Sequence, residues 1–343
     1  MIVSSLPLEA GGQLGPVEVA YETWGRLDAT ASNAVLVLHA LTGDTHAGGA
    51  GGWWEPLIGP GRPLDTDRFF VVCPNVLGGC RGSTGPASTS PDGRPYGSRF
   101  PVITIRDQVA AEAALADHLA IERWAAVVGG SMGGMRALEW CAGRPDRVAR
   151  AVVLAAGAAA TAEQIALCSL QVRAIRADPA YRGGDYYDGP DRPVRGLAIA
   201  RGIGQVSYRS EAELAARFGR EAQGAEDPLK GGRYAVESYL EHHGDKLAGR
   251  FDPNAYVVLS EAMNHHDVGR GRGGVARALA RVNAKVVVAG ISSDRLYPLH
   301  LQQQLVDLIP GAQPLQVIDS PVGHDGFLIA TDAVGQVVAD ALR

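Results

Sequence analysis

The sequence predicts an α/β protein with a mostly parallel central sheet that helices cover on both faces. Short, nearly continuous apolar runs recur along the chain, as is typical of strands buried on both faces. Segments of helical composition and spacing alternate with these runs, which favours parallel strands. A Gly-x-Ser-x-Gly motif at 129–133 also lies where a predicted strand passes into a predicted helix.

The predicted strands fall in the two outer parts of the chain. They are PVEVAYETW (16–24), NAVLVLHA (33–40), RFFVVCPN (68–75), WAAVVGG (124–130), RAVVLAA (150–156), NAKVVVAG (283–290) and QPLQVID (313–319). Helices are expected at 106–122, from Met132 onward, at 299–309 and at 325–343.

The segment 161–282 differs from the rest because it has no long apolar strand. Helical pieces at 161–177, 211–221 and 232–247 alternate there with charged and glycine-rich connectors. The strand pattern returns at 283, and a lone late strand needs the earlier sheet as its partner. We therefore expect one core of residues 1–160 and 283–343, with 161–282 inserted as a helical lid, and not a separate C-terminal domain.

Composition and charge exclude several classes of protein. With 46% hydrophobic and 20% charged residues, the chain resembles an ordinary soluble domain. A net charge of −5 gives no sign of a nucleic-acid or membrane-surface partner. The chain shows no secretory signal and no apolar stretch that could span a bilayer, so we expect a cytoplasmic protein. Four cysteines without a disulfide pattern are expected to pack as small apolar side chains.

Ser131, at the centre of the Gly-x-Ser-x-Gly motif, is the candidate nucleophile. Gly129 and Gly133 lack a Cβ atom, so a strand and a helix can approach closely around a strained serine. An apolar strand before this motif and a helix after it are the context of the nucleophile elbow in α/β-hydrolases. The sequence therefore predicts the α/β-hydrolase fold, and the flanking elements disfavour a plain glycine-rich turn.

A serine hydroxyl needs a base to remove its proton, and the base needs a partner that fixes its tautomer. In α/β-hydrolases the acid and then the histidine follow the serine, on loops after late strands. The loop ISSDRLYP (291–298) offers Asp294, and the loop PVGHDGF (321–327) offers His324. The order and the placement of both residues match this arrangement.

Other histidines and acids fit these roles less well. His39 precedes the serine, and His118 lies within a predicted helix. Asp307 falls in the middle of a helix, and Asp319 ends a strand instead of opening a loop. The histidines of the insertion lack the H-E-x-x-H spacing or a comparable metal-ligand pattern, so we expect no metal site; they are His242, His243, His265 and His266.

Acyl transfer also needs donors for the negative charge that develops on the attacked carbonyl. The backbone N–H of Met132, directly after the nucleophile, is one expected donor. The second should come from the loop after the strand at 33–40, where the sequence HALTGD points to the N–H of Leu41.

Seven motifs carry a resemblance to a known family and span nearly the whole chain. They are LHALTGD (38–44), CPNVLGGCRGSTGP (73–86), PYGSRFPVITIRDQV (95–109), VVGGSMGGM (127–135), ARGIGQVSYRS (200–210), ISSDRLYP (291–298) and GHDGFL (323–328). With these motifs the chain resembles the homoserine O-acetyltransferases of methionine biosynthesis, a family of the α/β-hydrolase fold.

The resemblance implies the same catalytic triad that the loops suggest. It further implies that Arg201 binds the carboxylate of homoserine, that Asp325 binds its ammonium group and that Tyr208 lines the site. A planar guanidinium can hold a carboxylate through two parallel hydrogen bonds. Without the resemblance, Arg201 would be interpreted as a solvated charge on a helix.

The resemblance also implies a reaction in two half-steps, in which acetyl-CoA acetylates the serine and homoserine then takes the acetyl group. Acetyl-CoA would be a co-substrate, no cofactor would be bound permanently, and the chain would form a homodimer through the lid helices. Succinyl-CoA as donor, serine as acceptor, an esterase or thioesterase, and a catalytically idle binding scaffold remain alternatives. A succinyl donor would need a cation near the serine, for which Arg81 and Arg136 are conceivable.

Overall fold

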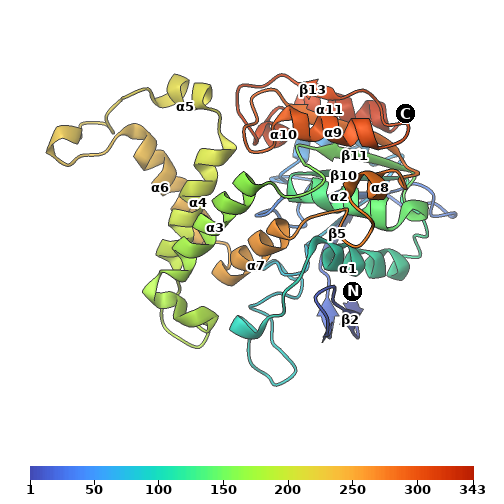
Figure 1. The fold of residues 1–343 in the computed structure, drawn as a ribbon, viewed down its shortest axis with the longest axis horizontal. Coiled ribbons are helices and arrows are strands. Elements are labelled where there is room, and N and C mark those ends of the chain that lie inside the picture. Colours follow the sequence, from blue (N-terminus) through green and yellow to red (C-terminus); the bar gives the residue numbers. More distant parts are fainter.

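A seven-stranded sheet forms the centre of the computed structural model, which describes residues 1–343 (Figure 1). The strand order is β13-β12-β11-β10-β6-β9-β5, and only the edge strand β5 runs antiparallel to its neighbour. The strands are β5 (Tyr21–Trp24), β6 (Ala34–Leu38), β9 (Phe70–Pro74), β10 (Ala126–Gly130), β11 (Arg150–Leu154), β12 (Lys285–Ile291) and β13 (Gln316–Ile318). Each predicted apolar run supplies one of them, so the predicted fold class is confirmed.

Alternate side chains of the central strands enter two separate apolar layers, which explains why these strands are apolar throughout. Leu36 and Leu38 of β6 pack into the layer formed with α1 (Ile105–His118), α2 (Met132–Gly143) and α9 (Leu299–Leu308). Val35 and Val37 enter the opposite layer, together with residues of α11 (Thr331–Ala341). Successive strand residues point to opposite faces, so both faces of the sheet are buried.

Two predicted elements are divided in the structure. The run 16–24 forms the short strand β4 (Val17–Glu18), which pairs with β1 (Ile2–Val3), before β5 begins. The prediction of one continuous helix at 325–343 is wrong. The first helix, α10 (Gly326–Ile329), ends at Ala330, whose φ of −80° and ψ of 56° are not helical. Helix α11 then starts anew. The remaining short strands are β2 (Leu6–Pro7), β3 (Gln13–Leu14), β7 (Ile58–Gly59) and β8 (Leu64–Asp65).

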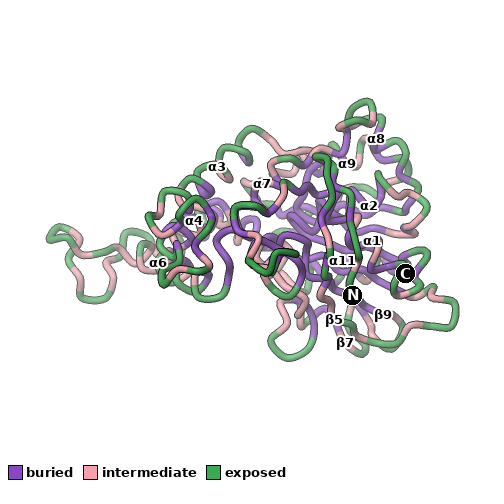
Figure 2. Tube along the Cα trace, turned by 90° about the horizontal axis from the view of Figure 1, so that it is seen from below, coloured by how far each residue is buried: buried purple, intermediate pink, exposed green.

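Most of the helices between 161 and 282 stand to one side of the sheet, whereas both chain termini lie on the core (Figure 1). These helices are α3 (Ala162–Arg176), α4 (Val194–Tyr208), α5 (Glu211–Phe218), α6 (Ala235–Ala248), α7 (Pro253–Asn264) and α8 (Val275–Leu279). The loop joining α5 to α6 projects furthest and is largely exposed (Figure 2). Helix α8 instead packs on the core through Ala278 and Leu279. We propose that residues 161–282 form a lid over the core.

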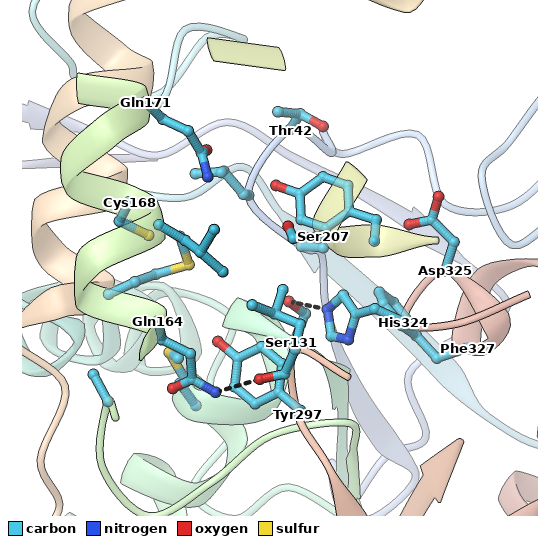
Figure 3. A pocket seen from close by; sticks show the side chains of 18 of the residues that line it. Thr42, Ser131, Gln164, Cys168, Gln171, Ser207, Tyr297, His324, Asp325 and Phe327 are labelled. Atoms are coloured by element: carbon cyan, nitrogen blue, oxygen red, sulfur yellow. Dashed lines mark hydrogen bonds between the residues drawn. The ribbon is translucent and has the colours of Figure 1, made fainter. Parts of the chain in front are cut away.

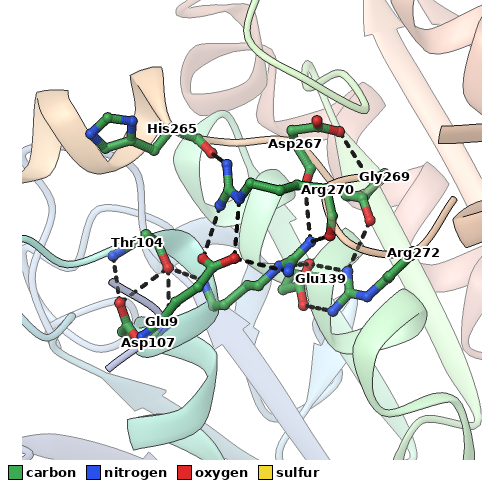
Figure 4. A network of polar contacts seen from close by, with 11 residues as sticks. Glu9, Thr104, Asp107, Glu139, His265, Asp267, Gly269, Arg270 and Arg272 are labelled. Carbon is green, nitrogen blue, oxygen red and sulfur yellow. Dashed lines mark hydrogen bonds and ion pairs between the residues drawn. The ribbon is translucent and has the colours of Figure 1, made fainter. Parts of the chain in front are cut away.

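A network of charged side chains links the segment that returns from the lid to the helices of the core (Figure 4). Glu9, near the N-terminus, pairs with Arg106 of α1 at 2.9 Å and with Arg270 at 2.9 Å. Arg272 pairs with Glu139 of α2. Helices α1 and α2 are thereby linked to the segment after α7. None of the helices has both the length and the apolarity that crossing a bilayer requires.

Candidate active site

Ser131 occupies a strained turn between β10 and α2. Its φ of 57° and ψ of −124° lie outside the regions that non-glycine residues favour, a conformation that costs about 1–3 kcal/mol. The serine N–H donates to the carbonyl of Leu154 on β11 at 3.0 Å. A Cβ atom on Gly133 would lie 2.0 Å from the carbonyl oxygen of Leu38, and one on Gly129 would lie 2.3 Å from that of Gly133. Only glycines therefore let α2 approach the sheet this closely.

Ser131, His324 and Asp294 form a continuous hydrogen-bonded chain, part of which is drawn in Figure 3. The hydroxyl of Ser131 lies 2.8 Å from Nε2 of His324, and Nδ1 of His324 lies 2.7 Å from Oδ2 of Asp294. An N–H at Nδ1 that donates to the carboxylate leaves the Nε2 lone pair facing the serine. Ser131 is 8% exposed and His324 is 3% exposed, so bulk water has little access to either group.

The loops that carry the acid and the base are fixed to each other by the hydroxyl of Ser293, a role that the sequence did not indicate. Oδ1 of Asp294 accepts the backbone N–H groups of Leu296 and Tyr297, each at 2.8 Å. The hydroxyl of Ser293 accepts the N–H of Gly323 at 2.9 Å, directly before the histidine. The ISSD motif therefore orients both loops as well as supplying the acid.

His324 has a raised pKa although it is buried. Burial lowers the pKa, but the charge and hydrogen bond of Asp294, together with the charge of Asp325, raise it by more, so the net value lies above the usual 6.5. The ring of Tyr297 stacks on the imidazole with the ring centres 4.9 Å apart, and Phe327 meets it edge-on at 5.3 Å. These contacts restrict the orientation of the base.

The two predicted oxyanion donors, the backbone N–H groups of Met132 and Leu41, have no partner within the protein. Met132 is the first residue of α2, so its N–H has no partner within the helix. Leu41 lines the cavity that contains Ser131, and its N–H makes no hydrogen bond in the structure. Both groups remain available for an external acceptor, and their role as the oxyanion hole stays a prediction.

His39 and Arg136 support the predicted oxyanion loop from behind. Nδ1 of His39 donates to the carbonyl of Ala40 at 2.7 Å, and burial lowers the pKa of His39 to about 3. Arg136 is fully buried, pairs with Glu112 at 2.6 Å and donates to the carbonyl of His39.

The idea that Arg136 or Arg81 meets a donor carboxylate is therefore wrong, because neither residue lines the cavity. Arg136 is held by Glu112 behind the oxyanion loop, and Arg81 faces Asp44 at 3.6 Å.

A cavity opens above Ser131 and is walled by both the core and the lid. Leu41, His324 and Asp325 come from the core, and Gln164, Cys168 and Gln171 face them from α3 (Figure 3). Spacings of four and three residues place these three α3 side chains on one face of the helix. The sequence predicted α3 but not its contribution to the site. Burial raises the pKa of the Cys168 thiol to about 11, so this cysteine remains protonated.

The three residues assigned by resemblance lie together on the wall of this cavity. Arg201 and Tyr208 come from α4, and the Arg201 guanidinium carbon lies 5.4 Å from the centre of the Tyr208 ring. Arg201 has no carboxylate within 4.0 Å, whereas Asp325 lies 3.4 Å from Arg209. Sequence reasoning missed Arg209, although it belongs to the same motif as Arg201 and follows it by two helical turns.

The histidines of the insertion do not gather into a cluster. No group of three or more His, Cys, Asp or Glu side chains lies close enough to hold a metal ion. His266 lies 3.0 Å from the carbonyl of Gly157, and burial lowers its pKa to about 4. All four cysteines are free; they are Cys73, Cys80, Cys141 and Cys168.

Comparison with known proteins identifies the fold and the family. A family model described as the alpha/beta hydrolase fold matches residues 33–331. A homoserine O-acetyltransferase of Thermobifida fusca (strain YX) is 61% identical over 345 aligned residues, covering 98% of this chain and 91% of the relative. A solved homoserine O-acetyltransferase from Bacillus anthracis has a TM-score of 0.94 at 27% identity, covering 100% of this chain and 96% of that one.

The same architecture also occurs in an enzyme of a different activity class. The crystal structure of an esterase has a TM-score of 0.92 at 27% identity and covers 100% of this chain and 98% of that one. The fold is therefore shared by a transferase and an esterase, so the fold alone does not identify the acceptor of the acyl group.

Proposed function

Because this chain belongs to the homoserine O-acetyltransferase family of the α/β-hydrolase fold, we propose that it moves an acetyl group from acetyl-CoA to the hydroxyl of L-homoserine. The products are O-acetyl-L-homoserine and CoA, in a step of methionine biosynthesis. The observation that carries the proposal is a hydrogen-bonded Ser131–His324–Asp294 triad that shares one cavity with the free guanidinium of Arg201.

In the first half-reaction, Nε2 of His324 takes the proton of Ser131, and the serine oxygen attacks the thioester carbon. The resulting oxyanion is bound by the N–H groups of Leu41 and Met132. The carbon–sulfur bond then breaks, and the thiolate takes the proton from His324 and leaves as CoA. Asp294 stabilises the transient imidazolium.

In the second half-reaction, the homoserine hydroxyl gives its proton to His324 and attacks the acetyl carbon on Ser131. The ester bond to the serine breaks, and the serine oxygen takes the proton back. Such alternation of donor and acceptor is ping-pong chemistry. No step needs a resident cofactor or metal, because the imidazole and two backbone N–H groups supply the proton transfer and the charge stabilisation.

Homoserine is held by its charged groups in this proposal. The guanidinium of Arg201 binds the carboxylate, and it is free to do so because no protein carboxylate lies within 4.0 Å. Asp325, adjacent to the base in sequence, binds the ammonium group, while Tyr208 closes the wall behind Arg201. The hydroxyl at the other end of the molecule is thereby directed toward His324.

The lining of the cavity supports acetyl over succinyl as the transferred group. Apolar side chains near the nucleophile include Leu41, Met135 and Leu167, and Arg201 is the only cation on the wall. A succinyl carboxylate would compete with homoserine for that one guanidinium. A side-by-side assay of acetyl-CoA and succinyl-CoA, each with homoserine and with serine, should show the highest kcat/KM for acetyl-CoA with homoserine.

Hydrolysis is the second candidate function, because an esterase shares the fold. The burial of Ser131 and His324 beneath the lid limits access of water to the acyl-enzyme, which favours transfer. The test is the rate of CoA release from acetyl-CoA with and without homoserine. Transfer predicts steady-state release that depends on homoserine, whereas release at the same rate without homoserine would establish a thioesterase.

We also propose that two copies of the chain associate through the lid helices. A groove along α4 and α6 is lined mainly by apolar side chains, among them Ile199, Ile203, Val206 and Leu240. Ile199 is 59% exposed and Val206 is 39% exposed in the single chain. A second copy that covers this face would remove the apolar surface from water.

A further inference from the structure

A second pocket lies beside the catalytic cavity, and four of the eight residues that line it have cationic side chains. Arg201 and Gln205 come from α4 and Arg209 from its end, with four-residue spacing that places them on one face of the helix. Lys246 of α6 and Arg250, which follows that helix, line the facing wall. Arg201 and Asp325 line both spaces, so the pocket adjoins the catalytic cavity.

The positive charge of this basic pocket is poorly compensated. Asp325 is the only carboxylate in its lining, and it faces Arg209 at 3.4 Å, a residue that also pairs with Glu213 at 3.3 Å. Arg201, Lys246 and Arg250 have no carboxylate within 4.0 Å, in a chain whose net charge is −5. A local excess of cations in an acidic protein indicates a site for a ligand with several negative charges.

The lowered pKa values of two residues that line the pocket agree with this charge excess. Burial lowers the pKa of His243 to about 4, and the charges of Arg201, Arg209 and Lys246 contribute to the decrease. Burial and then the charge of Arg201 lower the pKa of Arg250. Additional positive charge is therefore disfavoured at this place, and an anion would be favoured.

Two buried polar atoms of the lining lack partners within the protein. They are Nε of Arg209 and the amide oxygen Oε1 of Gln205. The amide nitrogen Nε2 of Gln205 does have a partner, because it lies 2.7 Å from the hydroxyl of Tyr239. A half-turn of the Gln205 amide would let the Tyr239 hydroxyl donate to its oxygen and would present N–H donors to the pocket. Buried groups without partners are costly, and an oxyanion ligand would satisfy them.

We propose that this basic pocket binds the phosphate groups of the acyl-CoA donor, with the pantetheine arm running past Arg201 to bring the thioester to Ser131. This inference rests on the proposed function. The homoserine carboxylate carries one charge and engages Arg201, so it does not account for Lys246 and Arg250. The diphosphate and 3′-phosphate of CoA carry several charges, and guanidinium and ammonium groups are the usual phosphate-binding side chains.

The test is Lys246→Glu, assayed with two donors at saturating homoserine. Acetyl-CoA carries the phosphates, whereas S-acetylpantetheine has the same thioester without them. Lys246 makes no hydrogen bond or ion pair within the protein and is exposed, so the substitution should not disturb folding. The control is Lys230→Glu, because Lys230 is the other lysine of the lid and pairs only with Asp227 on the surface.

We expect kcat/KM for acetyl-CoA to fall by about 10-fold or more in Lys246→Glu, the loss typical of a charged contact that becomes repulsive. The value for S-acetylpantetheine should fall much less, Lys246→Arg should restore most of the loss, and Lys230→Glu should match the wild type. Calorimetry should detect adenosine 3′,5′-bisphosphate binding to the wild type and weaker binding to Lys246→Glu.

Three results would overturn the phosphate site: a wild type that uses both donors equally well, a Lys246→Glu variant whose losses are equal for both donors, or a variant with no loss. Failure of the proposed function would look different, because CoA release by the wild type would then be absent or would not depend on homoserine.

Discussion

The backbone conformation at Ser131 determines where the nucleophile lies, because the strained turn directs the hydroxyl toward His324. The glycines around it permit this geometry by omitting side-chain atoms where α2 meets the sheet. Their role was predictable from the sequence, since this motif between a strand and a helix is specific to the nucleophile elbow. The contacts of Tyr297 and Arg209 with the site were not predictable, because they depend on how separate elements pack together.

Gly133→Ala should damage both stability and activity. The new Cβ atom would lie 2.0 Å from the Leu38 carbonyl oxygen, so α2 must move away from β6. We expect a decrease of about 2–3 kcal/mol in the free energy of unfolding in urea, with loss of activity. Gly249→Ala is the control, because a Cβ there would lie 3.5 Å from the nearest surrounding atom and the φ of −71° suits alanine. Equal stability of both variants would refute the close-approach argument.

Asp294→Asn should change the pH dependence of acylation. His324 acts as a base only when neutral, and its raised pKa means that activity increases with pH with a midpoint above 6.5. Removing the carboxylate charge should lower this midpoint and reduce kcat by about 10³–10⁴-fold. Single-turnover acylation measured across pH checks both effects. A midpoint identical to that of the wild type would show that Asp294 does not set the pKa of His324.

At the scale of elements, the parallel strands were predictable because each is apolar along its whole length and buried on both faces. Helix α4 was not predicted, because Gly196, Gly202 and Gly204 lower its intrinsic helical preference and its stability comes from packing against α3 and α6. The interruption at Ala330 was also missed, since no proline or glycine marks it.

The buried pair between Glu112 of α1 and Arg136 of α2 should be important for stability. Glu112→Ala would leave the guanidinium of Arg136 buried without its partner, which costs about 3–5 kcal/mol. Asp117→Ala on the same helix removes an exposed partner of Arg147 and should cost at most about 1 kcal/mol. Urea denaturation of both variants measures the difference. Similar values would mean that the buried pair has no special role.

At the scale of the whole molecule, the catalytic cavity exists only where the lid meets the core. The core supplies the triad, and the lid supplies Arg201, Tyr208 and the α3 wall. The sequence indicated an inserted segment through the gap in its strand pattern, but the cavity and the basic pocket arise from long-range packing that no local pattern encodes.

Association of two chains should depend on the apolar face of α4. Ile199→Asp places a charge in the groove between α4 and α6, and we expect dimers in the wild type and monomers in the variant by sedimentation velocity. Val102→Asp is the control, because Val102 is 56% exposed on the core and lies outside this groove. A monomeric wild type would remove the proposed interface.

The most direct test of the catalytic account is mass spectrometry of the protein after brief exposure to acetyl-CoA without homoserine. The account predicts one added acetyl group on the peptide that contains Ser131, its loss when homoserine is added, and no adduct in Ser131→Ala. An acetyl adduct that persists in Ser131→Ala, or one on another residue that homoserine removes equally well, would contradict it.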